Sequence, residues 1–423
     1  MQLYQEKIGP VQLALLETDK FKSTRIVFKF RAPLDEKTVT KRALLAMLFE
    51  TSNQTYPNQT DFRKKLAYLY GANFYTTVEK KGNEHIISAV FDMVDADLVP
   101  DGENLLAEAF AFIEQVFFNP LVKNQAFDEE TVEREKTNLQ SRLEGIYDDK
   151  ARYANRRLQE EMFAEDVFRV PASGLVEEIR QIDATNLFTY YQEWLKTDAI
   201  DVYVCGRISR NTLIPYLEKL VFPNRKNQMA QFTTNTARKE AQYVYDVQPI
   251  NQGKLAIGYQ TNTLFGDADF VALQLGNGLL GGYANSKIFV NVREKESLAY
   301  SASSRVDSFK GYLLISAGID EANYEKALAI ILEQVAAMKA GDFTEEELAQ
   351  TKEMYINQLL ETTDQAQGMI EISYNNQLRA SDLDPENWIR KIEQTTKEEV
   401  LAAIRKIELD TVYFLSRGVT EHA

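Results

Sequence analysis

Ser23-Thr-Arg-Ile-Val-Phe-Lys-Phe30 alternates polar and apolar side chains, and a shift of 229 positions places it on Lys254-Leu-Ala-Ile-Gly-Tyr259. Alternation with a period of two is typical of a strand that has one buried face. The same shift aligns Gly82 with Gly311, and each of these glycines precedes a second apolar run. We therefore predict that one strand–helix–strand block occurs twice in the chain.

Two further matches continue this alignment towards the C-terminus. Phe127-Asp-Glu-Glu130 aligns with Phe343-Thr-Glu-Glu346 at a shift of 216, and each segment opens a helical pattern behind an Asp or Thr N-cap. Tyr203 aligns with Tyr413 at a shift of 210. Because the shift only decreases along the chain, as deletions in the second copy would produce, we interpret the series as an internal duplication.

The duplication predicts an α+β fold with two homologous halves, 1–225 and 240–423. Each half is expected to contain a mainly antiparallel sheet flanked by helices. Each is also expected to close with an apolar strand, at 201–205 in the first half and 411–415 in the second. Residues 226–239 are polar and weakly patterned, which is typical of an interdomain linker.

The composition excludes several kinds of function. In the 423 residues, 48 Lys and Arg against 63 Asp and Glu give a net charge of −15, which repels nucleic acid and anionic membranes. Cys205 is the single cysteine, so the chain can form neither an intramolecular disulfide nor a cysteine-based zinc site. The only histidines are His85 and His422, so a site that needs two or three histidine ligands is excluded.

The N-terminal segment indicates neither export nor membrane insertion. Residues 1–10 carry charges where a signal peptide needs an unbroken apolar run, and no later stretch approaches the ~20 apolar residues of a membrane span. A single cysteine suits a reducing compartment. We therefore expect a cytoplasmic protein.

The segment Leu279-Leu-Gly-Gly-Tyr-Ala-Asn-Ser-Lys-Ile-Phe-Val-Asn-Val-Arg-Glu-Lys-Glu-Ser-Leu-Ala-Tyr-Ser301 is the least ordinary in the chain. It resembles the second-domain signature of the pitrilysin/insulinase family of zinc metallopeptidases, in the branch similar to mitochondrial processing peptidase. The resemblance implies two α/β halves of the clam-shell type that cleave unfolded peptides. It also implies that Arg293 and Tyr300 contact the substrate near the scissile carbonyl.

The same resemblance implies a zinc helix in the first half, with the motif His-x-x-Glu-His followed by Met-Leu-Phe. Here Met47-Leu-Phe49 follows Arg42-Ala-Leu-Leu-Ala46, so Arg42 and Ala46 stand at the imidazole positions and Leu45 at the catalytic Glu. Counting from Glu135 to the third family ligand reaches Arg142. None of these side chains ligates zinc at neutral pH, so we expect no metal in this chain and a helix that only packs.

Ordinary structural roles compete with each of these assignments. Arg293 could form a surface ion pair with Glu294 or Glu296. Tyr300 could be a half-buried residue at the start of a strand. His85 begins a predicted strand, and an exposed or hydrogen-bonded structural role is favoured there over catalysis.

The resemblance implies a metal-free subunit that pairs with a zinc-bearing paralogue and has no peptidase activity by itself. An unfolded peptide substrate would add as a strand to a sheet edge, for which 72–78 is the candidate in the first half. The alternative is a catalytically inactive scaffold or peptide-binding protein of the same fold. A homodimer stays open, and a self-sufficient metalloenzyme with carboxylate ligands is disfavoured because no cluster in the sequence suggests one.

Overall fold

The computed structural model describes residues 2–100, 102–225 and 229–417, so His422 lies outside the described residues. The chain divides into two compact units that are not single runs of sequence. The first unit comprises 1–144, 170–231 and 365–371, and the second comprises 145–169, 232–364 and 372–423. Each unit is an α+β structure with one main sheet, which confirms the predicted fold class.

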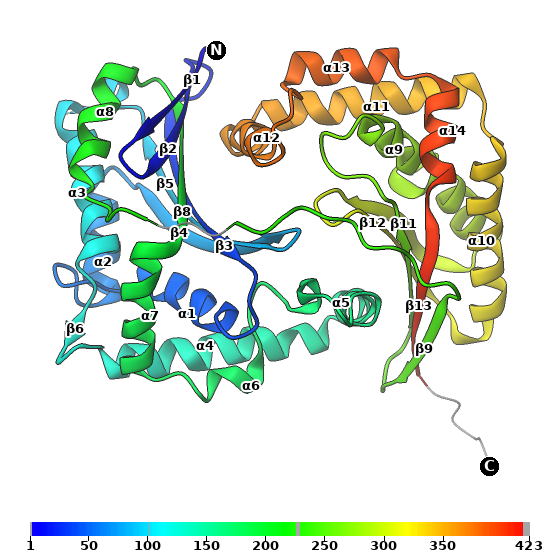
Figure 1. The fold of residues 1–423 in the computed structure, drawn as a ribbon, viewed down its shortest axis with the longest axis horizontal. Coiled ribbons are helices and arrows are strands. Elements are labelled where there is room, and N and C mark those ends of the chain that lie inside the picture. Colours follow the sequence, from blue (N-terminus) through cyan, green and yellow to red (C-terminus); the bar gives the residue numbers. More distant parts are fainter. Residues whose placement is uncertain (1, 101, 226–228, 418–423) are drawn as a thin grey trace. The chain divides into compact units, whose positions relative to one another are not determined.

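The sheet of the first unit has six strands, and only the β2–β8 pair is parallel. In spatial order they are β1 (Gln2–Ile8), β2 (Val11–Glu17), β8 (Ala199–Gly206), β3 (Ser23–Pro33), β5 (Glu84–Val94) and β4 (Asn73–Lys81). The alternating segment that begins at Ser23 forms β3 in the middle of this sheet (Figure 1). β1 and β2 are not among the predicted strands.

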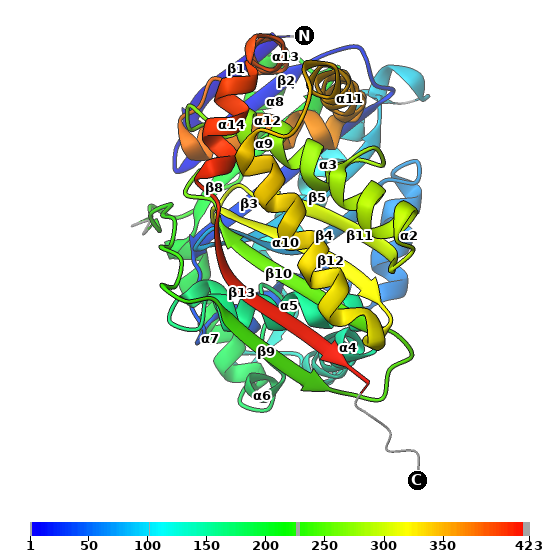
Figure 2. The same ribbon diagram turned by 90° about the vertical axis from the view of Figure 1, so that its right-hand side faces the viewer.

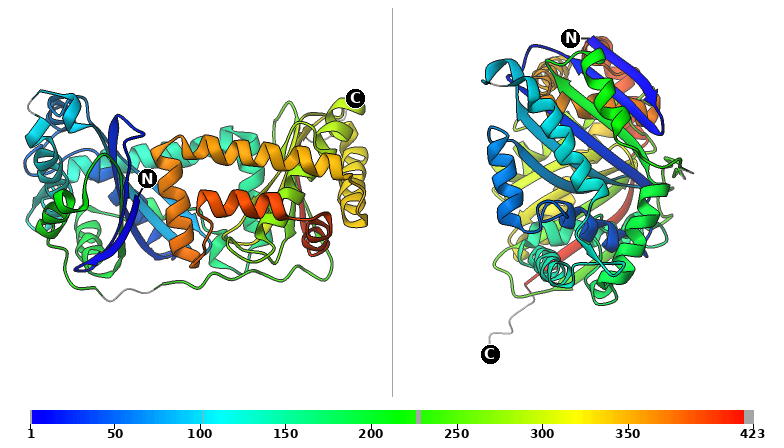
Figure 3. Two further views of the ribbon diagram at one scale, coloured as in Figure 1. Left: turned by 90° about the horizontal axis from the view of Figure 1, so that it is seen from above. Right: turned by 90° about the vertical axis from the view of Figure 1, so that its left-hand side faces the viewer.

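Helices cover one face of this sheet, as the right panel of Figure 3 shows. Phe28 and Phe30 of β3 point to this face. The ring centroid of Phe30 lies 4.5 Å from that of Trp194, and the ring centroid of Phe28 lies 5.2 Å from that of Phe117. The helices of the unit are α1 (Val39–Phe49), α2 (Gln59–Tyr68), α3 (Leu105–Phe118), α4 (Glu129–Asp148), α6 (Val176–Ile179), α7 (Ala184–Thr197) and α8 (Arg210–Lys219). A short hairpin of β6 (Val122–Lys123) and β7 (Ala126–Phe127) precedes α4.

The opposite face of the first sheet is charged. Arg25 of β3 forms an ion pair with Asp92 at 2.6 Å, and Lys29 forms one with Glu371 at 2.5 Å. Glu371 lies on α12 (Ala366–Arg379), which begins in the first unit and ends in the second. Although burial opposes its charge, the ammonium groups of Lys81 and Lys29 lower the pKa of Glu371. Ion pairs therefore fasten the start of α12 to this face.

The sheet of the second unit repeats the strand order of the first. In spatial order its strands are β11 (Ala299–Asp307), β12 (Tyr312–Ile319), β10 (Gly253–Gln260), β13 (Glu408–Ser416) and β9 (Gln242–Val247), and only β9 and β13 are parallel (Figure 2). β10 takes the central place that β3 has in the first sheet, and Gly82 and Gly311 both adopt positive φ, at 53° and 74°. The β1 strand of the first sheet has no counterpart in the described part of the second unit.

An apolar core forms between the second sheet and its helices, with Leu255, Ile257 and Tyr259 of β10 in its centre. The helices are α9 (Phe270–Asn277), α10 (Tyr324–Ala340), α11 (Glu345–Thr363), α13 (Pro385–Gln394) and α14 (Lys397–Arg405). The predicted cap Thr344 begins α11 with a complete capping box. On the other face, α5 (Lys150–Met162) packs on β10 and β13 through apolar side chains, where the first unit uses ion pairs.

Residues 229–239 contain neither helix nor strand. The Ala230 amide donates to Glu84 at 2.8 Å, and the Arg238 amide donates to Asp410 at 3.2 Å. Within the described ranges, every helix is too short or too polar to cross a membrane.

Candidate functional site

The glycine-rich segment of the second unit ends a helix and brings two backbones together. α9 continues into the π-helical turn η4 (Gly278–Gly282), as expected for a helix that breaks at the glycine pair. A Cβ at Gly281 would lie 2.6 Å from Ser304 Oγ and 2.8 Å from Ser304 N on β11. The missing side chain therefore allows β11 to approach the end of the helix closely.

A second π-helical segment, η5 (Phe289–Lys295), carries Arg293. Val292 is fully buried, and its carbonyl accepts a hydrogen bond from Leu298 N at 3.0 Å. Between them Ser297 adopts a φ of 51°, which turns the chain into β11 and its first exposed residue, Tyr300. Buried residues on both sides of the turn therefore hold Arg293 and Tyr300 on the outside of the unit.

In the described residues, Arg293 and Tyr300 do not make the contacts that a purely structural role would give them. The Arg293 guanidinium lies 4.7 Å over the Phe289 ring, and in the described ranges it forms no ion pair with Glu294 or Glu296. Glu296 instead forms an ion pair with Lys326 at 2.6 Å. Tyr300 is 82% exposed rather than half-buried. The structural alternative for this pair is therefore wrong in both of its parts.

Two π-helical turns lie in this segment: η4 precedes the site, and η5 carries Arg293. π-Helical turns are rare, and they are frequent at functional sites. Their position supports a functional reading of the segment that does not depend on the sequence motif.

The helix at the zinc-motif position, α1, is buried along nearly its whole length. Leu45 and Ala46 are 0% and 3% exposed and pack as expected. Arg42, however, does more than pack: its guanidinium forms an ion pair with Asp198 at 2.8 Å and donates through Nε to His85 Nδ1 at 2.8 Å. Although burial disfavours its charge, the Asp198 carboxylate raises the pKa of Arg42. A cation thus occupies the position of the first expected zinc ligand.

His85 is fully buried and hydrogen-bonded, the second of the two structural roles expected for it. Because Nδ1 accepts from Arg42, Nε2 carries the proton and donates to the Ala172 carbonyl at 2.8 Å. Burial and the neighbouring Arg42 charge lower the pKa of His85 to about 3. The imidazole is therefore neutral at pH 7 and has no free nitrogen for a metal or a substrate.

Arg142 is exposed on α4, away from the buried polar cluster around Arg42. Glu135, from which its position was counted, is buried and accepts hydrogen bonds from Arg134 and Asn138 at 3.0 Å each. No group of three His, Cys, Asp or Glu side chains that could hold a metal occurs in the described residues. The side chains at the motif positions thus do not fit a zinc ion.

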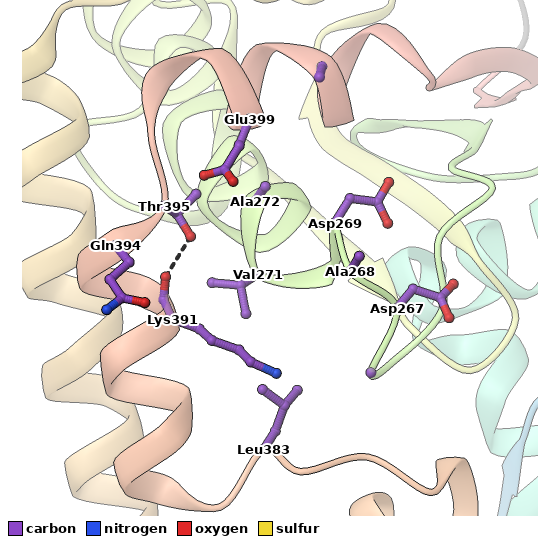
Figure 4. Close-up of a pocket in the computed structure, with 12 residues that line it drawn as sticks. Asp267, Ala268, Asp269, Val271, Ala272, Leu383, Lys391, Gln394, Thr395 and Glu399 are labelled. Atoms are coloured by element: carbon purple, nitrogen blue, oxygen red, sulfur yellow. Dashed lines mark hydrogen bonds between the residues drawn. The ribbon is translucent and has the colours of Figure 1, made fainter.

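A pocket of about 540 Å³ lies elsewhere in the second unit, beside the start of α9 (Figure 4). Three of its four charged side chains form ion pairs, and the fourth, Glu399, accepts a hydrogen bond from Thr396 N in the capping box of α14. Asp267 forms an ion pair with Arg379 at 3.0 Å, and Asp269 forms one with Lys406 at 2.6 Å. Neither Arg293 nor Tyr300 lines this pocket.

The duplicated α+β fold, the exposed Arg and Tyr, and a motif helix without ligands together define a metallopeptidase-fold protein that lacks the metal site. The Peptidase M16 inactive domain family matches residues 181–355. "Probable inactive metalloprotease YmfF" of Bacillus subtilis is 38% identical over 411 residues, which cover 97% of this chain and 96% of that protein. The chain therefore belongs to the M16 peptidase family, the pitrilysin/insulinase family, as a member of the inactive type.

Solved structures agree with this assignment. A conserved protein from Enterococcus faecalis V583 superposes with a TM-score of 0.94 at 35% identity, and each chain is covered completely. The peptidase M16 inactive domain from Pseudomonas fluorescens superposes with a TM-score of 0.82 at 16% identity over the whole of both chains, which shows the shared fold. The predicted family is thus confirmed, and the cytoplasmic location stays a prediction.

Proposed function

We propose that this chain is the non-zinc subunit of a two-subunit, processing-peptidase-like metalloendopeptidase. In this proposal Arg293 and Tyr300 bind an unfolded peptide, and a zinc-bearing paralogue hydrolyses it. The observation that carries the proposal is the exposure of both side chains, with Arg293 free of any ion pair to its neighbouring glutamates.

The chemistry of the two groups suits a peptide carbonyl. The guanidinium offers several N–H donors in a fixed plane, and the phenol offers one O–H. When a carbonyl is attacked, negative charge develops on its oxygen, and donors already in place stabilise that charge. Burial of Val292 and Leu298 fixes the backbone that carries both groups, so binding would cost side-chain but little backbone conformational entropy.

The peptide backbone would be bound by strand addition. β4, which contains most of the predicted 72–78 segment, is the last strand of the first sheet. An edge strand has unpaired N–H and C=O groups, and these bind an extended peptide with little dependence on its sequence. β4 is therefore the proposed edge for an unfolded substrate.

The second candidate is an inactive scaffold or peptide-binding protein without a catalytic partner. A scaffold has no need for a cation and a phenol that are both exposed on a rigid turn. In a scaffold, Arg293 and Tyr300 would be replaceable without functional effect, which separates the two candidates experimentally.

The test mixes the full chain with the zinc-bearing paralogue from the same genome and follows hydrolysis of an unstructured peptide. Arg293→Ala and Tyr300→Phe should each reduce kcat/KM by about 10²-fold, the typical effect of losing one oxyanion donor. Matched controls are Arg305→Ala, an exposed arginine on β11, the strand of Tyr300, and Tyr68→Phe, an exposed tyrosine of the first unit. An active mixture in which both site variants keep the full rate would contradict the assignment.

Metal analysis of the isolated chain provides an independent check. The expected zinc content is far below one ion per chain, because the four motif positions offer no ligand. Stoichiometric zinc would contradict a metal-free subunit whatever the mixing experiment shows.

A further inference from the structure

β9 is an edge strand with an unusually apolar exposed side. It is the last strand of the second sheet, next to β13 (Figures 1 and 2). Tyr243, Tyr245 and Val247 are 49%, 55% and 68% exposed, and their alternation places them on one face of the strand. We call these three side chains and the backbone that carries them the β9 edge.

The backbone of the β9 edge points away from the sheet. Gln248 N donates to Ser416 O at 3.0 Å, so the even-numbered residues of this segment direct their N–H and C=O groups to β13. Because these groups alternate in direction along a strand, those of Tyr243, Tyr245 and Val247 point outwards. In the described ranges, no hydrogen bond from another segment satisfies them.

The corresponding edge of the first sheet is covered by the chain itself. β2, the counterpart of β9, pairs with β1 in an antiparallel hairpin from Gln2–Glu17 to Ile8–Val11. Nothing in the described part of the second unit takes the place of β1. Open apolar edges promote pairing with other chains, and proteins usually protect them with charges, prolines or a covering segment. The three exposed side chains of the β9 edge offer no such protection.

We propose that the β9 edge is a self-association surface, at which two copies of this chain pair β9 with β9 in antiparallel orientation. The register that uses all outward groups places Tyr245 opposite its own copy and Tyr243 opposite Val247 of the second copy. Each of the three resulting residue pairs is of the hydrogen-bonded type, because both of its members point outwards. A shift by one residue would place each outward-pointing residue opposite an inward-pointing one, so the hydrogen-bonded pairs would be lost.

The side chains suit this register as well. An aromatic residue directly opposite a β-branched one is a favourable cross-strand pair. On the other face Val244 stands opposite Asp246, so no like charges meet. Asp246 is held in place by the Tyr413 hydroxyl at 2.7 Å, and Tyr245 by the Tyr324 hydroxyl at 2.7 Å. Neither side chain has to rearrange before the edges meet.

The interface should be weak and strengthened by salt. A strand of six residues offers only a small interface, below the ~1,200 Å² of a standard stable one, and we expect a dissociation constant in the micromolar range. Each copy carries a net charge of −15, so the copies repel one another at long range, and salt screens this repulsion. Dimerisation should therefore tighten as the salt concentration rises.

Sedimentation of the full chain over a concentration series tests the proposal without any partner protein. Tyr243→Lys with Val247→Lys places lysine opposite lysine at both flanking pairs, and should raise the dissociation constant about tenfold or more. Tyr243→Glu with Val247→Lys places glutamate opposite lysine in the same register, and should restore dimerisation. Val221→Lys, at a valine that is 79% exposed in the first unit, is the matched control and should leave the dissociation constant unchanged.

Each outcome decides the proposal. A wild-type chain that stays monomeric up to about 100 µM overturns it, because even a small interface associates in this range. Dimers that tolerate the double lysine variant overturn it as well, since association then uses another surface. A glutamate–lysine variant no better than the double lysine variant overturns the register. These results do not depend on Arg293, Tyr300 or a zinc-bearing partner.

Discussion

Arg42→Met is the sharpest test of the view that a structural cation has replaced the first zinc ligand. The substitution keeps an unbranched side chain of helix-forming type but removes the guanidinium. Five contacts are lost together. They are the ion pair with Asp198 at 2.8 Å and the hydrogen bonds to His85 Nδ1 at 2.8 Å, Phe30 O at 3.1 Å, His85 O at 3.3 Å and the Tyr190 hydroxyl at 3.3 Å. Asp198 is then left as a buried carboxylate without its partner.

The magnitude follows from that burial. Arg42 and Asp198 are 1% and 0% exposed, so solvent cannot replace the lost contacts. Removing one partner of a buried ion pair costs about 3–5 kcal/mol. With a urea m-value of about 2 kcal/mol/M, the unfolding midpoint should fall by about 2 M. Burial raises the pKa of Asp198, so protonation relieves part of the loss and the effect should be smaller at pH 5 than at pH 8.

The two tryptophans of the chain allow each unit to be followed separately. Trp194 packs 4.5 Å from Phe30 in the first unit, and Trp388 lies in the core of the second. In a Trp388→Phe background, fluorescence therefore reports the unfolding of the first unit alone.

Arg142→Met is the matched control for Arg42→Met, because it removes the same group at another motif position where the side chain is exposed. Exposed substitutions of this kind usually change stability by less than about 0.5 kcal/mol. Equal urea midpoints for the two variants would refute the reasoning, since burial and pairing at Arg42 would then contribute nothing.

Two further predictions concern the buried histidine and the glycine turn. The pKa of His85 is lowered to about 3 in the fold, below its ordinary value near 6.5. Between these values the unfolded chain binds the extra proton, so the free energy of unfolding decreases as the pH is lowered. His85→Gln should remove a slope of up to about 1.4 kcal/mol per pH unit below pH 6.5, and urea midpoints measured from pH 8 to pH 5 that keep the wild-type slope would contradict this. Gly281→Ala should destabilise the second unit by about 1–3 kcal/mol, because its Cβ would meet Ser304 at 2.6 Å. Gly145→Ala, in a helix with nothing within 4 Å, should be neutral or stabilising by up to about 1 kcal/mol, and equal thermal midpoints for the two glycine variants would count against the close approach.

The central strands could be predicted from sequence because their signal is local. β3 and β10 alternate in step with the strand period, β5 and β12 are apolar runs, and the glycines before β5 and β12 mark tight turns. β1, β2 and β9 were not predicted. β1 and β9 lie at sheet edges and contain no buried residue, so they lack the buried apolar face by which a strand is recognised. Two tyrosines and a valine of β9 are exposed, although apolar side chains that alternate in this way usually form the buried face of a strand. The local sequence does not distinguish an exposed apolar face from a buried one.

The same contrast between local and distant information applies to the candidate site residues. Arg293 and Tyr300 became candidates because one segment resembles a family signature, which is a property of the sequence alone, and their substrate role stays a prediction. Whether Arg293 pairs with the glutamates beside it depends on where Lys326 of α10 lies, and that helix folds back from 30 residues further along the chain.

By itself the sequence determined the duplication, the family and the absence of a His-x-x-Glu-His motif, since each of these depends on residue types at set intervals along the chain. Only the tertiary structure decided that Arg42 became the centre of a buried polar cluster, because Asp198 lies 156 positions away and meets it only after α7 packs against α1. The open β9 edge is likewise a fact of sheet order rather than of composition. A strand is exposed or covered according to which distant segment pairs beside it, and local periodicity carries no record of that choice.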